Sequence, residues 1–437
     1  RFTKKSIHLM AHDALKKAED LVNQLIEFKE NYASNFGSKN KNDDIEKRLK
    51  DVLLELDQLQ LMIDNKAKFF CLRGKALNVL PYFDSRAVES LSKAVKLDPT
   101  LIEAWNELGE SYWKDKKIEE AQNCFQGAIN KKKNKVSLRN LSMVQRQLGN
   151  DFNSRVSHVK ESVSTAKEAV ALDLTDGRSW FVLGNAYLSL FFYAGQCPKV
   201  LKQSLAAYAK AESDIREVNN ADLYYNKAVV LKFQELYEEA LKCYKKSSLL
   251  APSWNDPKEN IDDLHNRLKT TVEMIENKGY HKSKKLNLFT SQLKDSDFGI
   301  YSNCFYKNSS NQVVAIKKVL ISDLNLFQNN DVAVCGKVIA IIPVKDGVPF
   351  SFIMMDAAFA CIAVSVFNLA VEKGLIVGDT VAISNPFVQD HNVTTETQIF
   401  SYKSIRVETP LVMMINKRKV GPERLAFSVL TVANESE

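Results

Sequence analysis

Residues 105–128 read WNELGESYWKDKKIEEAQNCFQGA, and this stretch decides the fold of the first two thirds of the chain. It carries large and small apolar residues in two blocks, which are Trp105, Leu108, Gly109 and Tyr112, and then Ala121, Phe125 and Ala128. The small residues allow two antiparallel helices to approach closely, and the aromatic side chains fill the remaining volume. The stretch therefore predicts a helix, a short turn and a second helix packed on the first.

The same spacing recurs along the chain, and a period of 34 residues for a pair of helices is typical of the tetratricopeptide repeat. One copy precedes the quoted stretch and ends at residues 97–99, and three copies follow, marked by Leu138, Trp180 and Tyr224. In the copies marked by Leu138 and Trp180, extra residues separate the two halves of the motif, so we expect long loops there. Five copies exceed the roughly three that such a stack needs for stability.

Segments on both sides of the repeats predict caps. Residues 10–32 and 43–65 are amphipathic stretches that predict a degenerate first helix pair, and residues 256–279 have the apolar stripe of a terminal helix. A lysine-rich stretch from His281 onward predicts a linker. The predicted organisation is an N-terminal helical cap at 1–66, five irregular repeats at 67–255, a capping helix at 256–280, a basic linker at 281–298 and an OB-fold-like domain at 299–437.

Beyond residue 299 the period of the apolar residues changes from helical to alternating, which indicates strands. Runs of β-branched and aromatic residues occupy 332–342, 350–355, 360–367, 380–383 and 399–408, with a helical stretch at 368–373 after the third run. This order is that of a five-stranded OB barrel, and Gly336 predicts a bend in the first strand. We expect a hairpin at 301–320 and further strands at 411–415 and 425–432. The predicted fold class is an α-helical repeat solenoid followed by a β-rich, OB-fold-like barrel.

The composition fits a globular protein of two or three domains, with 437 residues, of which 45% are hydrophobic and 26% are charged. The net charge of +7 is too diffuse to identify a polyanionic partner by itself. The seven cysteines are scattered without a CxxC pair, which indicates reduced thiols in an intracellular protein. No apolar run is long enough to span a bilayer and no signal peptide is recognisable, so we expect no membrane association.

Motifs that mark enzymes are missing, since the sequence has no GxSxG, no HExxH, no P-loop and no GxGxxG that opens a helix. His8 and His12 stand four residues apart, but no third metal ligand accompanies them, so we interpret them as a solvated helix face. Asp173 and Asp176 resemble half of a calcium loop, yet Gly184 stands where the closing glutamate belongs. We therefore expect no enzyme, no metal and no cofactor.

In a solenoid of this kind, the first helix of each repeat lines a concave groove, and the residues between the signature positions face that groove. The residues that we expect there are Arg139, Arg146, Arg178, Asn185, Asp222, Tyr225 and Asn226. Arg139 and Arg146 offer guanidinium groups to an acidic side chain, and Asp222 can accept from an arginine or an amine. The pattern favours a peptide that carries both charges, although ordinary solvated charges on a helix face would give the same sequence.

A basic set lies on the second helices, toward the outer side of the stack. Lys93 and Lys96 either contact phosphates there or are ordinary surface lysines. In the OB-like domain the strand residues are mostly aliphatic, so we expect the barrel to bind protein or to stabilise the fold rather than to bind nucleic acid.

Residues 134–148, 176–190 and 404–411, together with the irregular repeats and the C-terminal barrel, resemble the tetratricopeptide repeat protein 5 (Strap) family over nearly the whole chain. The resemblance implies a non-enzymatic adaptor at the ribosome. In this role the groove recognises the N-terminal Met-Arg-Glu peptide of nascent tubulin and triggers tubulin mRNA decay, which is tubulin autoregulation. Carried over by position, Arg146 meets the acidic side of the peptide, Asp222 meets its basic side, and Lys93 and Lys96 face the ribosome and its RNA.

The resemblance also implies a second role, as a stress-responsive cofactor of p300 and of p53-dependent transcription after DNA damage. The partners are then p300 and associated transcription cofactors, in place of the ribosome and the mRNA decay machinery. The two roles together imply a cytoplasmic and nuclear localisation. We found no sequence feature that belongs to the transcriptional role alone.

Overall fold

A computed structural model describes residues 4–36, 41–194, 196–307, 312–345, 348–370, 374–396 and 398–426. The chain divides into two compact units. The first runs to Val230 and includes Leu249–Ser253, and the second contains Leu231–Ser248 and the described residues from Trp254 onward. These two units are defined by compactness and not by the repeat pattern. The limits of the five segments predicted from the sequence therefore stay a prediction.

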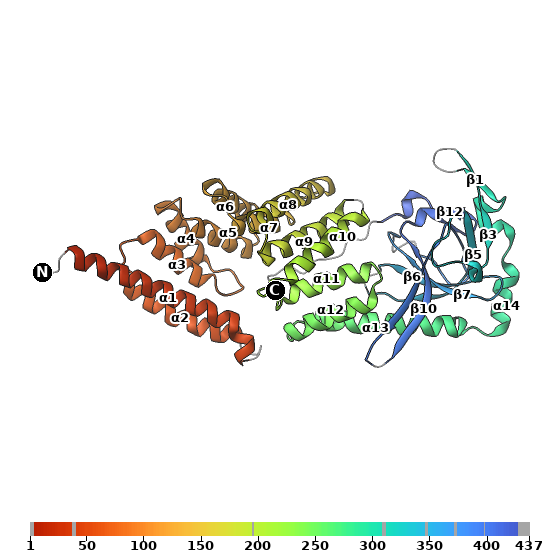
Figure 1. Cartoon of the computed structure of the whole chain (residues 1–437), viewed down its shortest axis with the longest axis horizontal. Helices are drawn as coiled ribbons and strands as arrows, with labels where there is room; N and C mark the ends of the chain where they lie inside the picture. The colour runs from red at the N-terminus through yellow and green to blue at the C-terminus, as the bar shows by residue number, and fades with distance from the viewer. Residues whose placement is uncertain are drawn as a thin grey trace. The chain divides into compact units, whose positions relative to one another are not determined.

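The first unit is built from helices that pack as successive antiparallel pairs (Figure 1). Its helices are α1 (Lys4–Phe36), α2 (Lys41–Leu59), α3 (Lys66–Leu77), α4 (Ser85–Leu97), α5 (Ile102–Lys114), α6 (Ile118–Lys131), α7 (Lys135–Gln145), α8 (Phe152–Leu172), α9 (Gly177–Tyr193), α10 (Pro198–Glu212) and most of α11 (Ala221–Phe233). The first helices of neighbouring repeats also touch one another, in the order α3, α5, α7 and α9. This arrangement confirms the helical repeat solenoid.

Small residues on one helix face large residues on its partner, as the sequence predicts. A Cβ atom on Gly109 of α5 would lie 2.6 Å from the buried ring of Phe125 on α6. The same relation holds for Gly184 of α9, whose added Cβ would lie 2.5 Å from the buried ring of Tyr208 on α10. Glycine is therefore required where the two helices of a repeat approach most closely.

The prediction of long loops in the third and fourth repeats is wrong. The extra residues extend the helices instead, since α8 has 21 residues and α9 has 17. Helix α8 begins early because Asp151 caps it, accepting a hydrogen bond from the backbone N–H of Ser154 at 2.9 Å. The apolar period of the motif locates the buried face of a helix but not where that helix starts.

The second unit combines helices with a β-sheet. Its elements are most of α12 (Tyr237–Leu250), α13 (Asp256–Glu276), the short helix η1 (Lys278–Tyr280), α14 (Ser283–Gln292), the short helix η2 (Asp295–Tyr301), β1 (Phe305–Lys307), β2 (Val313–Ala315), β3 (Lys317–Val319), β4 (Phe327–Gln328), β5 (Val332–Ile342), β6 (Phe350–Met355), β7 (Cys361–Val366), β8 (Thr380–Ser384), β9 (Phe387–Thr394), β10 (Ile399–Val407), β11 (Met413–Ile415) and β12 (Arg418–Lys419). Strands β1 and β2 form the predicted hairpin.

The remaining strands pair in the order β12, β11, β8, β5, β6, β7, β10, β9 and β4, and β3 pairs with β5 beside this path. Only Asn385 and Pro386 separate β8 from β9, so the two strands act as halves of one bent strand. One half pairs with β5 and the other with β10, which itself runs parallel to β7. The bend therefore closes the sheet into a ring, and the predicted OB barrel is confirmed.

Two predicted elements near the barrel turn out differently. The helix expected at 368–373 is not formed at Asn368–Ala370, and residues 371–373 lie outside the described part of the chain. Of the strand expected at 425–432, Leu425 forms a single bridge to Leu369, and the residues after Ala426 lie outside the described part. Neither segment is needed to close the ring.

The segment predicted as a basic linker at 281–298 contains helix α14. Its Leu286 and Phe289 are buried against the outer side of the barrel, beside Ile339 and Ile353. The lysines of this stretch indicate a linker, whereas two apolar residues three positions apart are enough for one turn of a helix to pack. Helices α13 and α14 thus cover the outer side of β5 and β6.

A buried ion pair joins the last repeat to the barrel inside the second unit. Glu235, in the turn before α12, has a fully buried side chain and accepts a hydrogen bond from Arg406 of β10 at 3.1 Å and from the Tyr237 hydroxyl at 3.0 Å. The Arg406 guanidinium lies 3.9 Å from the centre of the Phe367 ring. Burial alone would raise the pKa of the Glu235 carboxyl, but Arg406, together with His391, Arg267 and a hydrogen bond from Ser365, holds that pKa below its ordinary value.

Candidate peptide-binding face

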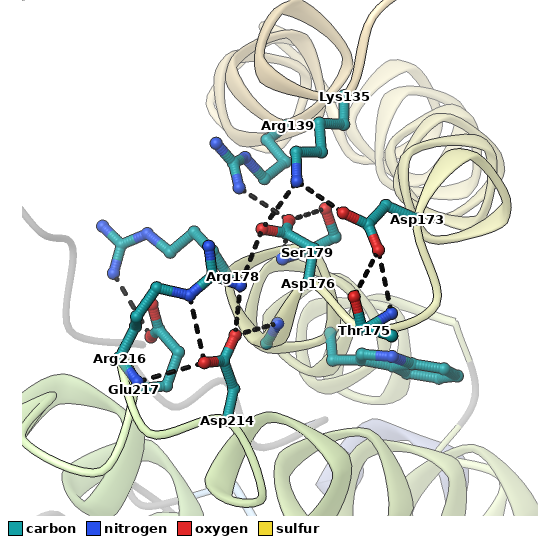
Figure 2. A network of polar contacts seen from close by, with 12 residues as sticks. Lys135, Arg139, Asp173, Thr175, Asp176, Arg178, Ser179, Asp214, Arg216 and Glu217 are labelled. Carbon is teal, nitrogen blue, oxygen red and sulfur yellow. Dashed lines mark hydrogen bonds and ion pairs between the residues drawn. The ribbon is translucent and has the colours of Figure 1, made fainter.

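The first helices α5, α7, α9 and α11 of successive repeats form what we call the first-helix face, and its charged residues meet where one repeat joins the next. At the α7–α9 junction, Asp176 caps α9 and accepts from the backbone N–H and the hydroxyl of Ser179 at 3.0 and 2.5 Å. Arg139 on α7 donates to the same carboxylate at 2.7 Å, and Lys135 lies 3.2 Å from it (Figure 2). Burial favours the neutral acid, but these donors keep the pKa of Asp176 below its ordinary value.

Arg139 is therefore engaged with a neighbouring repeat. Its side chain is only 15% exposed and that of Asp176 is 4% exposed, so the pair is largely shielded from water. The sequence predicts that Arg139 is available for an acidic group of a ligand. The structure instead gives it a partner within the chain, and a direct contact of Arg139 with a peptide stays a prediction.

A second cluster follows at the α9–α11 junction. Asp214 accepts from Arg216 at 2.7 Å and from the backbone N–H of Gly177 at 2.8 Å, and these donors hold the pKa of Asp214 well below its ordinary range. Arg178, the second residue of α9, lies 3.6 Å from Glu217 (Figure 2). The cluster places an arginine and a buried carboxylate next to the start of α11.

Asp222 lies in the first turn of α11 and is half-buried. Burial raises the pKa of its carboxyl, and Glu217 adds to the rise while Arg178 opposes it. Among the described residues, nothing lies within hydrogen-bond or ion-pair distance of the Asp222 carboxylate. A desolvated acid of this kind is suited to receive an arginine or an amine from outside the chain.

Arg146 ends α7 and is also half-buried. Its positive charge acts on the phenol of Tyr208, whose pKa is raised by burial and partly lowered by the arginine. The Tyr208 hydroxyl donates to Asn185 at 2.7 Å, and Asn226 donates to the same amide oxygen at 3.1 Å. The structure thus brings Arg146, Asn185 and Asn226 together around one tyrosine.

The two asparagines are less accessible than the sequence suggested. Asn185 is 2% exposed and Asn226 is 0% exposed, because their amides join α9 to α11 in the interior of the stack. Tyr225, by contrast, is half-buried on α11 between Asp222 and Asn226. A hydrogen bond from either asparagine to a peptide backbone stays a prediction.

The sequence did not predict Asp214 and Glu217 as part of this site. It drew notice to Asp176 only as a residue of an incomplete calcium loop. One signal was readable, since Asp176 stands three residues before Ser179 at the start of an apolar helix, which is an N-cap pattern. Asp214 and Glu217 lie in the loop after α10, where no period marks them. No group of three candidate metal ligands occurs in the part of the chain that the structure describes.

Lys93 and Lys96 lie on α4, the second helix of the first repeat, and both are exposed. Lys93 pairs with Glu89 one turn earlier at 2.7 Å and lies over the Phe70 ring at 5.6 Å. An exposed pair of this kind contributes little to stability, so Lys93 is readily available to another anion. Within the described ranges, no helix is both long and apolar enough to cross a bilayer.

Comparison with known proteins identifies a class and then a family. Residues 315–429 match the family model "Tetratricopeptide repeat protein 5 OB fold domain", and residues 102–132 and 221–253 match "Tetratricopeptide repeat". The fold and the matches define a tetratricopeptide repeat protein with a C-terminal OB domain. Such repeats bind protein partners, so the chain is a protein-interaction adaptor.

The chain belongs to the tetratricopeptide repeat protein 5 family. It is 39% identical to tetratricopeptide repeat protein 5 of Homo sapiens over 428 residues, which is 97% of each chain, and 39% identical to that of Bos taurus over 430 residues. Among solved structures it is similar to YrrB, described as a TPR protein with an unusual peptide-binding site, at 20% identity and a TM-score of 0.31 over 45% of this chain and 92% of that one. It is also similar to MamA, at 18% identity and a TM-score of 0.30 over 39% and 89% of the two chains.

Proposed function

We propose that the first-helix face binds the N-terminal Met-Arg-Glu peptide of nascent tubulin on the ribosome, and that the bound adaptor triggers decay of the tubulin mRNA. In this role the chain has no enzymatic activity of its own. The observation that carries the proposal is the state of Asp222, a desolvated carboxylate without a partner among the described residues. Family membership supports the same role.

The charges on this face suit a peptide in which an arginine precedes a glutamate. Asp222 would accept from the arginine of the peptide, or from its amino terminus, by a charge-assisted hydrogen bond. Arg146, two repeats earlier at the end of α7, would meet the acidic side chain. Arg178 and Glu217 lie beside Asp222. Their charges would disfavour peptides of other sequences, whose charged side chains would meet a like charge at this position.

The direct test is the affinity of a labelled Met-Arg-Glu-Ile peptide for the full chain and for Arg146→Ala and Asp222→Asn. Loss of one charge-assisted hydrogen bond should weaken binding roughly ten- to a hundredfold in each variant. Arg48→Ala and Asp20→Asn make comparable changes at exposed positions of α2 and α1 and should leave the affinity unchanged. Equal affinities across all five proteins would contradict the proposal and return attention to the p300 cofactor role.

Binding should also depend on pH in a defined direction. Because burial raises the pKa of Asp222, the carboxylate that receives the arginine is lost at a higher pH than for an ordinary aspartate. Affinity should therefore fall as the pH is lowered from neutral, and Asp222→Asn should remove most of this fall. An unchanged pH profile in the variant would place the cationic group of the peptide elsewhere.

Recruitment to the ribosome is a separate part of the proposal and rests on Lys93 and Lys96. The double variant Lys93→Glu and Lys96→Glu should reduce co-sedimentation with ribosomes at physiological salt, because phosphate contacts are lost and replaced by repulsion. The pair Lys160→Glu and Lys199→Glu changes the net charge equally at exposed positions and serves as the control. Unchanged sedimentation of the first variant would remove these lysines from the ribosome contact.

A further inference from the structure

A cavity lies beside strands β7 and β10 of the barrel, inside the second unit. Its volume is about 260 Å³, and its wall comes from the end of α13, the short helix η3 (Ile321–Asp323), the start of β7 and the middle of β10. An apolar cavity of roughly 150 Å³ already holds a benzene molecule. The cavity therefore has room for one large apolar side chain, such as that of leucine or phenylalanine.

The lining of the cavity is mainly apolar and comes from elements far apart in the sequence. Ile275 of α13, Leu324 after η3, Ile362 of β7 and Val388 of β9 all contribute to it. Ile362 and Val388 are also buried members of the barrel core. Because packed core side chains hold their positions, the cavity exists before any ligand arrives.

Strand β10 presents an unpaired edge to this cavity. It pairs with β9 along Ile399–Arg406, but its pairing with β7 begins only at Ser404, opposite Ala363. On the β7 side, no strand in the described ranges pairs with Ser401–Lys403, and all three of these residues line the cavity. The backbone groups on that side are therefore available to another extended segment.

An unpaired carboxylate also lines the cavity. Glu276 is the last residue of α13 and is exposed. Among the described residues it has no ion-pair partner, and nearby Lys278 is held over the Phe359 ring at 5.5 Å. The C-terminal end of a helix carries a partial negative charge, and the last turn of α13 has no basic residue to offset it. Glu276 and the helix end thus both favour a cation from outside the chain.

The one lysine of the lining differs from Glu276. Lys403 lies directly opposite Asp390 on β9, so an acid of the same hairpin offsets its charge. The net preference of the cavity is therefore for a ligand that carries a positive charge.

We propose that this cavity is the docking site for an extended peptide segment of a partner protein, in which a large apolar residue stands two positions from a lysine or arginine. The segment lies along Ser401–Lys403 as an added strand, which is a recurring mode of peptide recognition. Residues two positions apart in a strand lie on the same face. The apolar side chain fills the cavity, and the basic side chain pairs with Glu276.

Each of the three features selects a different part of this ligand. The open strand edge is complemented by a peptide backbone and not by a lipid chain or a small apolar molecule. The cavity selects an apolar side chain, and Glu276 disfavours acidic segments. The site lies in the second unit and shares no residue with the first-helix face, so it goes beyond the proposed recognition of Met-Arg-Glu and does not depend on it.

The first step of the test is a selection of random octapeptides displayed on phage, with the full chain as the bait. A parallel selection uses Ser401→Trp, which places a large ring at the cavity from an exposed position. Peptides enriched on the unaltered chain alone should share an apolar residue two positions from a lysine or arginine. These peptides are then synthesised with a fluorescein label, and their affinities are measured by fluorescence anisotropy.

The variants separate the parts of the site. Ser401→Trp, or alanine in place of the apolar residue of the peptide, should weaken binding roughly ten- to 150-fold. Glu276→Gln should weaken it roughly two- to fivefold, because the ion pair is exposed to water. Thr394→Trp and Asp262→Asn make the same changes at exposed positions outside the cavity, on β9 and α13, and should leave the affinity unchanged. Because all four positions are exposed, the variants should unfold at the same temperature as the unaltered chain.

Methylation of the peptide backbone tests the strand pairing itself. In an added strand every second N–H faces β10, so single N-methyl groups along the peptide should weaken binding in an alternating pattern, by roughly two- to tenfold at each sensitive position. A ligand held by its side chains alone would show no alternation.

Three results would overturn the inference. The first is that no octapeptide is enriched on the unaltered chain over Ser401→Trp, and the second is that N-methylation shows no alternation. The third is a dimer of the chain in analytical ultracentrifugation that Ser401→Trp dissociates, which would assign the cavity to a second copy of this chain. Preserved binding of Met-Arg-Glu-Ile to Ser401→Trp and Glu276→Gln separates this test from that of the first-helix face.

Discussion

Replacement of Arg406 by methionine tests whether a buried ion pair holds the last repeat against the OB barrel. Arg406 donates to Glu235 at 3.1 Å and to the backbone carbonyl of Phe233 at 3.0 Å, and its side chain is only 11% exposed. Methionine keeps the length and the contact with the Phe367 ring but removes the charge. The fully buried carboxylate of Glu235 then loses the guanidinium that compensates it.

Removal of one partner from a buried ion pair destabilises a protein by about 3–5 kcal/mol, because the other charge stays desolvated. The Tyr237 hydroxyl still donates to Glu235 at 3.0 Å, so we expect the lower end, about 3 kcal/mol, in the second unit. A further change, Glu235→Gln, removes the buried negative charge that has lost its partner. The double variant should therefore be more stable than Arg406→Met alone, which is a coupling between neighbouring residues.

Hydrogen exchange followed by mass spectrometry is the suitable assay, because it reports the two compact units separately. Amides of β6, β7 and β10 should lose roughly 150-fold in protection in Arg406→Met and recover part of it in the double variant. Lys403→Met alters an exposed lysine of the same strand and should change little. A loss below about 1 kcal/mol, or a double variant no more stable than the single one, would refute the reasoning.

Other predictions concern the first unit and are each checked by urea unfolding. Arg139→Ala should lower the free energy of unfolding by about 1.5–3 kcal/mol, because it removes a charge-assisted hydrogen bond from buried Asp176, and no change would mean that Lys135 and Ser179 suffice. Gly109→Ala should cost about 1–3 kcal/mol, because its Cβ would lie 2.6 Å from the Phe125 ring. Burial and Glu110 raise the pKa of Glu107 to about 7, so stability should fall as the pH rises from about 4.5 toward 7, and Glu107→Gln should abolish that slope.

The repeat architecture was predictable because it is encoded locally. Gly109 and Phe125 lie sixteen residues apart, and a close helix pair requires a small residue opposite a large one at that spacing. The strand runs of the barrel were also predictable from local sequence, since short runs of apolar and β-branched residues form β5 to β8, which are buried along nearly their whole length. The lengths of α8 and α9 were not, because a cap such as Asp151 decides where a helix begins.

The partners of the charged residues could not be predicted from the sequence. Periodicity places Arg139 and Asn185 on the first helix of a repeat, but their contacts come from Asp176 and Tyr208, which are 37 and 23 residues away. Glu235 and Arg406 are 171 residues apart, so no local pattern relates them. The availability of Asp222 is likewise a property of the packing around it and not of its place in the repeat.

The central claim is that Asp222 receives the arginine of an incoming Met-Arg-Glu peptide, and a double-mutant cycle across the complex tests it most directly. Titration calorimetry would compare Met-Arg-Glu-Ile with the same peptide carrying citrulline, a neutral analogue of arginine, on the unaltered chain and on Asp222→Asn. Each single change should weaken binding roughly ten- to a hundredfold, and both together should weaken it no further than one alone. Effects that simply add would show that Asp222 and the peptide arginine do not meet, and would contradict the account.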